Sequence, residues 1–384
     1  MHSAAVVGVG ETDYAADYAK RRDPAAPRRD AYSYAVAAFT RALRDAGLQR
    51  DAIDGLVVGP PLAYERTAEI LGLDLDWAAT GDHTQAIGLA TMALATGAAR
   101  AVALVYGNDQ RSAGLRYGGA ATPGAEQFLA YSYFAPWGLT SQGALYALMT
   151  QRYREVHGLT DAALAEVALN QRRYAQVTPG AVMTGPLTLD DYLAGPFIVE
   201  PLRLYDYCLV NDGGVALVLT TPDRAVGLAR PAVEIAAVGR VDGNREATSL
   251  RPRLVDFYHP AHRRAAKKLY DAAGVGPEDI RCVQIYDSFS IHVPVALEGF
   301  GFFPEGAAEA FLVGGGLRPG GRLAVNTAGG HLSGSYMQGW GHQVEAVRQL
   351  RGDAGPRQVP DIEHVLYISD VAGKVTGILY RRAA

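Results

Sequence analysis

The chain has 384 residues, of which 49% are apolar and 20% charged, and its formal net charge is −4. This length suits two ordinary domains or one large duplicated one. Charges of both signs are interspersed and no basic block occurs, so we expect no nucleic-acid partner.

Cys208 and Cys282 are the only cysteines, with no CxxC and no His/Cys cluster at metal spacing. We therefore expect two free thiols and no metal in this chain. The N-terminal residues have no signal-peptide pattern, and no apolar run reaches the length that crosses a membrane. We predict a soluble cytoplasmic protein with no membrane partner.

Short runs rich in Val, Ile and Ala indicate buried strands at 4–9, 55–58, 101–106, 215–220, 233–238, 283–286, 322–325, 364–369 and 375–380. Stretches of helical period lie between them, at 30–46, 84–97, 140–157, 164–176, 260–273 and 343–351. Strands that alternate with helices predict an α/β fold whose strands are covered on both faces.

The order strand, loop, small-residue helix, strand occurs twice along the chain. The run 55–58 leads to the helix 84–97 and the strand 101–106, and 282–286 leads to the helix 343–351 and the strand 364–369. We predict a duplicated chain with an N-terminal half, 1–225, and a C-terminal half, 226–384. The region of about 107–205 fits neither copy and is predicted to be an insertion.

A glycine-rich segment from Asn326 to His342 leads into the last of these helices and contains Gly329, Gly330, His331 and Tyr336. It is typical of a strand, a tight loop and a helix N-terminus, where backbone N–H groups favour developing negative charge. A side chain there would lie beside any oxyanion that the chemistry generates. We therefore take these residues as candidate site residues.

Several other motifs each allow two interpretations. Gly8-Val-Gly10 could begin a dinucleotide site, but the third glycine is missing, which favours a tight turn. His83, just before the buried helix 84–97, could be an acid or base or could only pack. Asp287 and Ser288, which follow a strand after Tyr286, are expected to cap the next helix.

Two further groups are candidates for substrate binding. The aromatic segment 128–138, with Tyr131 and Tyr133, could line an apolar channel or a subunit interface. Arg251 and Arg253 could contact phosphates of a nucleotide-bearing substrate, or remain solvated.

The pattern resembles the thiolase superfamily, in particular the sterol-carrier-protein-type thiolases and their non-thiolase relatives. The resemblance spans almost the whole chain and rests on the segments 7–12, 284–289, 301–306 and 325–341. It implies a duplicated, five-layered α/β/α/β/α fold with the active site at the pseudo-twofold axis.

This sequence departs from the family at its catalytic motifs. Gly81 stands where the family has its nucleophilic cysteine, His-Asp-Cys-Phe is replaced by Tyr286-Asp287-Ser288-Phe289, and Gly-His-Pro by Ser335-Tyr336-Met337. The late Cys-x-Gly motif is absent. Acyl-enzyme chemistry needs the thiolate, so we do not expect a thiolase.

Both family histidines have become tyrosines, a combination that resembles the steroid side-chain aldolases of bacterial sterol and bile-acid degradation. The resemblance implies retro-aldol cleavage of a β-hydroxyacyl-CoA to a ketone and acetyl-CoA or propionyl-CoA. Tyr286 and Tyr336 would be the acid and base, with Gly81, His83, Asn326, Gly329, Gly330 and His331 around the substrate.

The resemblance also implies a homodimer that joins a small OB-fold partner subunit, which often carries zinc, in a heterotetramer. Coenzyme A would enter as part of the substrate, with no cofactor in this chain. Two other functions remain open, a non-catalytic lipid or acyl-CoA carrier and an acyltransferase or condensing enzyme of the superfamily.

Overall fold

The structure is a computed structural model, and it describes residues 4–20, 27, 29–115, 133–243, 257 and 259–383. Ten strands are hydrogen-bonded in the order β10-β9-β11-β12-β8-β1-β7-β4-β2-β3. Their bounds are β1 Ala5–Glu11, β2 Gly55–Val58, β3 Trp77–Thr80, β4 Ala101–Asn108, β7 Gly213–Thr220, β8 Val233–Asp242, β9 Cys282–Ile285, β10 Ala324–Val325, β11 His364–Ser369 and β12 Lys374–Arg382. A separate hairpin joins β5 Phe197–Val199 to β6 Leu202–Arg203.

The strand order is mirrored about the pair β1–β8. On one side β3, β2 and β4 are parallel, and β7 and β1 follow antiparallel. On the other side β10, β9 and β11 are parallel, and β12 and β8 follow antiparallel. This repetition supports the predicted division of the chain near residue 225, which stays a prediction.

The helices are α1 Tyr14–Lys20, α2 Ala31–Ala46, α3 Tyr64–Leu71, α4 Ala86–Thr96, α6 Gln142–His157, α7 Asp161–Gln176, α8 Leu189–Ala194, α9 Pro222–Ala225, α10 His259–Ala273, α11 His292–Gly299, α12 Ala308–Val313 and α13 Trp340–Arg351. Among the described residues, none of these helices combines the length and the apolarity that crossing a bilayer requires.

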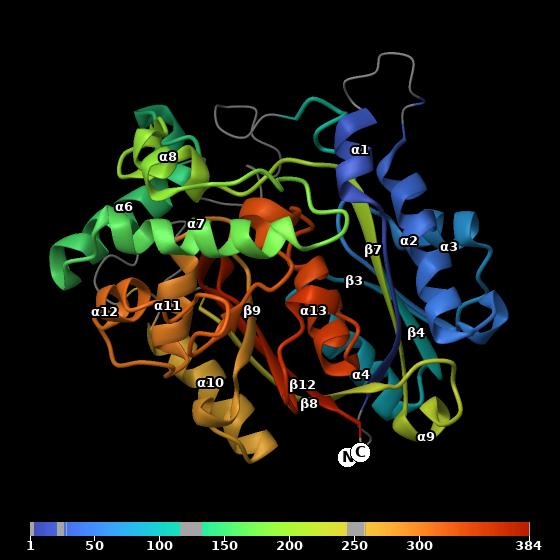
Figure 1. Ribbon diagram of the computed structural model, residues 1–384. Coiled ribbons are helices and arrows are strands. Elements are labelled where there is room, and N and C mark those ends of the chain that lie inside the picture. The colour runs from blue at the N-terminus through green and yellow to red at the C-terminus, as the bar shows by residue number, and fades with distance from the viewer. Residues whose placement is uncertain are drawn as a thin grey trace.

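The helices and strands are arranged in layers (Figure 1). Helices α2 and α3 cover one face of the β1–β4 strands, α10 and α11 cover strands of the second half, and α4 and α13 lie between the two groups of strands. Strand β4 shows how alternation builds these layers, since Val102 and Leu104 face the α4–α13 core and Ala103 and Val105 face the α2 core. The fold is therefore the expected thiolase-like α/β fold.

Glycines let α2 lie directly on the sheet. A Cβ atom added at Gly10 would stand 2.1 Å from the carbonyl oxygen of Ala38, and one at Gly107 would stand 1.9 Å from that of Ala31. Gly10 belongs to the Gly8-Val-Gly10 motif, so the motif's glycines serve close helix packing in β1 rather than a nucleotide. Gly239 in β8 meets α10 at Ala265 in the same way.

The sequence patterns locate most strands to within a few residues but miss β3, the hairpin and several short helices. β3, with the sequence Trp-Ala-Ala-Thr, is only four residues long and has little β-propensity of its own. It is formed because β2 pairs with it in parallel. Helix α13 begins at Trp340, three residues before the periodic pattern indicates.

We expect Gly10→Ala to lower the free energy of unfolding by about 1–3 kcal/mol, because the added methyl group must push α2 away from β1. Gly185→Ala is the matched control, since nothing lies within 4 Å of a Cβ atom there. Denaturant unfolding of both variants measures the difference. Equal stability of the two would contradict this account of the α2 contact.

Candidate active site

The two predicted catalytic tyrosines meet at the ends of distant segments. Tyr286 directly follows β9, and Tyr336 lies in the loop before α13. Their hydroxyl oxygens are 3.1 Å apart, within hydrogen-bonding distance, and either group can be the donor. Both side chains are buried, and Tyr336 keeps 9% of its surface exposed. The structure therefore brings together the pair that the sequence singles out.

The glycine-rich loop is folded tightly against the end of β9. Asn326 has a positive φ of 53°, and its side-chain amide accepts from the N–H of Ile285 and donates to the carbonyl of Ile285. Gly329 and Gly330 also have positive φ and lead into a turn of π-helix, Gly330–Gly334. A Cβ atom at Gly330 would lie 2.2 Å from Asp287, so only glycine fits there.

Tyr336 is held in place through its backbone. Its N–H donates to the side-chain oxygen of Asn211 at 2.7 Å, and the Asn108 side chain donates to the carbonyls of Asn211 and Tyr336. These asparagines come from the end of β4 and the turn before β7. Two segments from much earlier in the chain thus fix the position of Tyr336.

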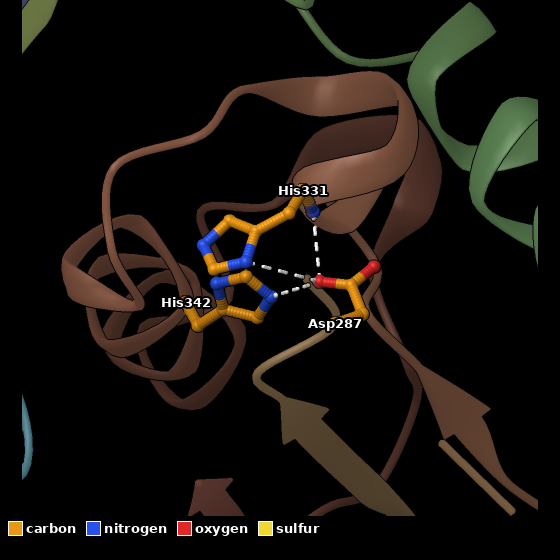
Figure 2. Close-up of side chains that lie close together, drawn as sticks. All are labelled: Asp287, His331 and His342. Carbon is orange, nitrogen blue, oxygen red and sulfur yellow. Dashed lines mark hydrogen bonds and ion pairs between the residues drawn. The ribbon is translucent and has the colours of Figure 1, made fainter. Parts of the chain in front are cut away.

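Asp287 brings His331 and His342 together (Figure 2). Its Oδ1 accepts from the backbone N–H of His331 at 2.8 Å and from Nε2 of His342 at 3.0 Å. Its Oδ2 accepts from Gln171 on α7 at 3.2 Å. Asp287 therefore does not cap α11 as the sequence suggested, since α11 begins at His292 without a side-chain cap. It joins three separate segments instead.

Ligand atoms of Asp287, His331 and His342 lie within 4.8 Å of one another, as in a metal site. However, Nε2 of His331 accepts from the N–H of Gly339 at 2.9 Å. The proton must then be on Nδ1, which faces Asp287 at 3.5 Å. A metal would need the lone pair of that Nδ1, so the arrangement fits a hydrogen-bonded cluster rather than a metal site.

His83 is a further neighbour of the tyrosine pair. Its ring stacks on Tyr286 with the centroids 4.9 Å apart, and its Nε2 lies 3.1 Å from the hydroxyl of Ser369. Burial lowers the pKa of His83 to about 4, although Asp82 opposes this shift. Burial also lowers the pKa of His331 well below its usual value. Two neutral rings therefore flank the tyrosines at neutral pH.

Gly81 and Tyr133 are two further predicted site residues that the structure describes. Gly81 is buried after β3, where a Cβ atom would stand 2.7 Å from Leu89. Tyr133 is 69% exposed and its ring contacts Phe134. Tyr131, Arg251 and Arg253 lie outside the described residues. The substrate-binding roles of all these residues stay predictions.

Asn108, Gln171 and His342 also belong to the site, although no sequence motif points to them. The signal for His342 is its place in α13, a buried helix that nevertheless carries polar side chains. Gln171 and its neighbour Asn170 are likewise buried polar residues on α7. A buried polar side chain on an otherwise apolar helix face needs a partner, and here the partners lie in the site.

Comparisons with known proteins agree with this geometry. Residues 245–375 match the family model "Thiolase C-terminal domain-like". The chain is 32% identical over 98% of both lengths to the 17-hydroxy-3-oxo-4-pregnene-20-carboxyl-CoA lyase of Mycobacterium tuberculosis. This chain belongs to the thiolase superfamily, among the steroid side-chain-cleaving aldolases.

Two further proteins are similar to this chain over almost its whole length. A steroid side-chain-cleaving aldolase of Thermomonospora curvata is 32% identical over 98% of this chain and 97% of its own length. A solved structure of an Ltp2-ChsH2(DUF35) aldolase superposes with a TM-score of 0.87 at 30% identity, covering 99% of this chain and 98% of that one. The enzyme is thus an aldolase, a carbon–carbon lyase.

The lowered pKa of His83 predicts how the free energy of unfolding depends on pH. Unfolded histidine binds a proton near pH 6.5, whereas His83 does so only near pH 4 in the folded protein. Between these values the unfolded state binds more protons, so stability falls as the pH is lowered from about 6.5 to 4, by on the order of 3 kcal/mol for one such group. His83→Gln should flatten this slope in urea titrations. An unchanged slope would show that His83 does not carry the effect.

Proposed function

We propose that this chain cleaves a β-hydroxyacyl-CoA with a steroid side chain by a retro-aldol reaction, giving a ketosteroid and acetyl-CoA or propionyl-CoA. The observation that carries the proposal is the 3.1 Å contact between the hydroxyls of Tyr286 and Tyr336. The names of the full-length relatives, a pregnene-carboxyl-CoA lyase and a steroid side-chain-cleaving aldolase, support the steroid thioester as substrate.

The tyrosine pair can relay a proton from the substrate β-hydroxyl to the α-carbon. The oxygen of the first tyrosine accepts the proton of the β-hydroxyl while its own proton passes to the second tyrosine. In the same step the second tyrosine gives its outward proton to the α-carbon. The bond between the α- and β-carbons breaks, its electrons form the thioester enolate, and the β-carbon becomes a ketone.

This relay removes the need for a stable phenolate. A free tyrosine has a pKa near 10, so a separate phenolate base would be rare at neutral pH. In a concerted relay neither tyrosine carries a full charge, which suits a site walled by neutral His83 and His331. General acid–base catalysis of this kind contributes about 10²–10⁴-fold.

Several N–H groups of the glycine turn already have acceptors within the protein. The N–H groups of Gly329, Gly334 and Ser335 donate to carbonyls within the turn, and that of Gly339 donates to His331. We therefore assign stabilisation of the enolate to the outward O–H of the tyrosine pair, in place of the backbone N–H groups that the sequence suggested.

The cysteines support a route without a covalent acyl-cysteine. Burial raises the pKa of Cys208 to about 12, and burial also raises the pKa of Cys282 in β9. Neither thiol therefore provides a thiolate at neutral pH. Gly81, at the position of the family nucleophile, has no side chain to react.

We expect Tyr286→Phe and Tyr336→Phe each to lower kcat for ketosteroid formation by about 10²–10⁴-fold, because each breaks the proton relay. The assay follows CoA products and ketosteroid by mass spectrometry after incubation with a steroid β-hydroxyacyl-CoA and the partner subunit. Tyr64→Phe, on the exposed side of α3, is the control and should leave kcat unchanged. Near-normal turnover in both site variants would end the assignment.

We further propose a homodimer that joins a DUF35 partner subunit, the small OB-fold subunit expected from the sequence, in a heterotetramer. The similar solved structure is an Ltp2-ChsH2(DUF35) aldolase, which supports the partner. For the dimer, the edge strand β3 and the exposed Met92 on the apolar helix α4 offer an unpaired surface. Zinc, where present, would belong to the partner.

The inserted region offers a separate apolar surface on α8, the β5–β6 hairpin and the residue after it. Its exposed members are Leu189, Leu193, Phe197, Ile198 and Leu204. In Figure 1 the α8 region lies at the opposite side of the molecule from α3. We propose that the DUF35 subunit docks here, because a patch of this kind on an insertion is typical of a partner surface.

A matched pair of variants separates the two interfaces. Ile198→Asp should abolish co-purification with the DUF35 subunit and leave the dimer mass unchanged, since a charge would be buried in that contact only. Met92→Asp should instead reduce the dimer to monomers. Light scattering and co-purification measure both. Loss of the partner in Met92→Asp alone would contradict the placement on the insertion.

A further inference from the structure

A second constellation lies beside the tyrosine pair and is not used by the retro-aldol reaction. The hydroxyl oxygen of Ser288 is 3.0 Å from Nε2 of His292, and Nδ1 of His292 is 2.5 Å from Oδ1 of Asp370. The three residues come from the turn after β9, from the start of α11 and from the end of β11. Their connection, serine to Nε2 and Nδ1 to aspartate, is the order found in serine hydrolases.

The neighbours of Asp370 and His292 determine which atoms of these two side chains carry protons. His292, and His262 through its Nε2 at 3.2 Å from Oδ2, hold the pKa of Asp370 below its usual value against the effect of burial. An ionised Asp370 accepts from Nδ1 of His292, which leaves Nε2 free to accept the proton of Ser288. Tyr146 packs over the His292 ring with the centroids 4.3 Å apart and holds its orientation.

Ser288 is the most exposed of these three residues. His292 is 0% exposed and Asp370 1%, whereas Ser288 keeps 6%. The edge of the His292 ring also faces Tyr286, with centroids 6.0 Å apart. The histidine that would accept the Ser288 proton therefore lies beside the tyrosine pair.

We propose that Ser288, activated by His292 and Asp370, is a nucleophile that makes this protein an acyl-CoA thioesterase in addition to its proposed lyase activity. The Ser288 proton moves to Nε2 of His292 as the serine oxygen bonds to the thioester carbonyl carbon. The carbon–sulfur bond breaks, and the thiolate of coenzyme A takes that proton. Water then attacks the acyl-serine ester, with His292 as base, and releases the carboxylic acid.

This inference shares with the proposed function only the binding of an acyl-CoA in this site. The test therefore uses a steroid acyl-CoA without a β-hydroxyl group, which cannot undergo retro-aldol cleavage. The released thiol is measured with a chromogenic disulfide. Wild-type protein should release thiol from this substrate, so that failure of the lyase proposal would leave this test intact.

We expect Ser288→Ala and Asp370→Asn to lower thiol release at least 10³-fold, as losses in other serine triads do. Ser290→Ala, two residues further along the same turn and 0% exposed, is the matched control and should keep the activity. A fluorophosphonate probe should label Ser288 of the wild-type protein, as peptide mapping by mass spectrometry would show. Absence of label on Ser288, or equal thiol release by wild type and Ser288→Ala, would overturn the proposal.

Discussion

The buried carboxylate of Asp287 is the constraint on which the site depends. A carboxylate without solvent must have its oxygens filled by donors, and Asp287 obtains them from His331, His342 and Gln171. These donors belong to the glycine-rich loop, α13 and α7, so satisfying one side chain fixes three segments against the end of β9. The loop that carries Tyr336 is thereby placed within reach of Tyr286, and the active geometry follows from polar satisfaction rather than from apolar packing.

The neutral histidine rings beside the tyrosines separate this site from one built on a thiolate. Burial keeps His83 and His331 uncharged at neutral pH, and both cysteine thiols are protonated. A thiolate would need a nearby positive charge to be stable, and neither of these flanking rings supplies one. Proton transfer between neutral hydroxyls needs no such charge. The replacement of the family's histidines and cysteine therefore fits a site that transfers protons between neutral hydroxyls.

Most strands and helices and part of the site could be predicted from the sequence. Buried strands and helices leave periodic patterns, and the resemblance to a family aligns the family's motifs with positions of this chain. The sequence predicts the tyrosine pair and His83 as site residues, and their roles stay predictions. It does not predict the contact between Asp287 and His342, because hydrogen bonds between residues 55 positions apart leave no local pattern. Asp287 instead looked like a helix cap, since aspartate after a strand commonly is one. Tertiary contacts decide the role of such a residue, and only the fold supplies them.

Three consecutive residues after β9 have three different sets of partners. The hydroxyl of Tyr286 lies beside that of Tyr336, the hydroxyl of Ser288 beside His292, and the carboxylate of Asp287 beside His331 and His342. His331 also contacts the ring of Tyr286, so the carboxylate and the tyrosine pair share a neighbour. A change at Asp287 would therefore disturb the tyrosine pair through the loop, whereas a change at Ser288 would act first on its contact with His292.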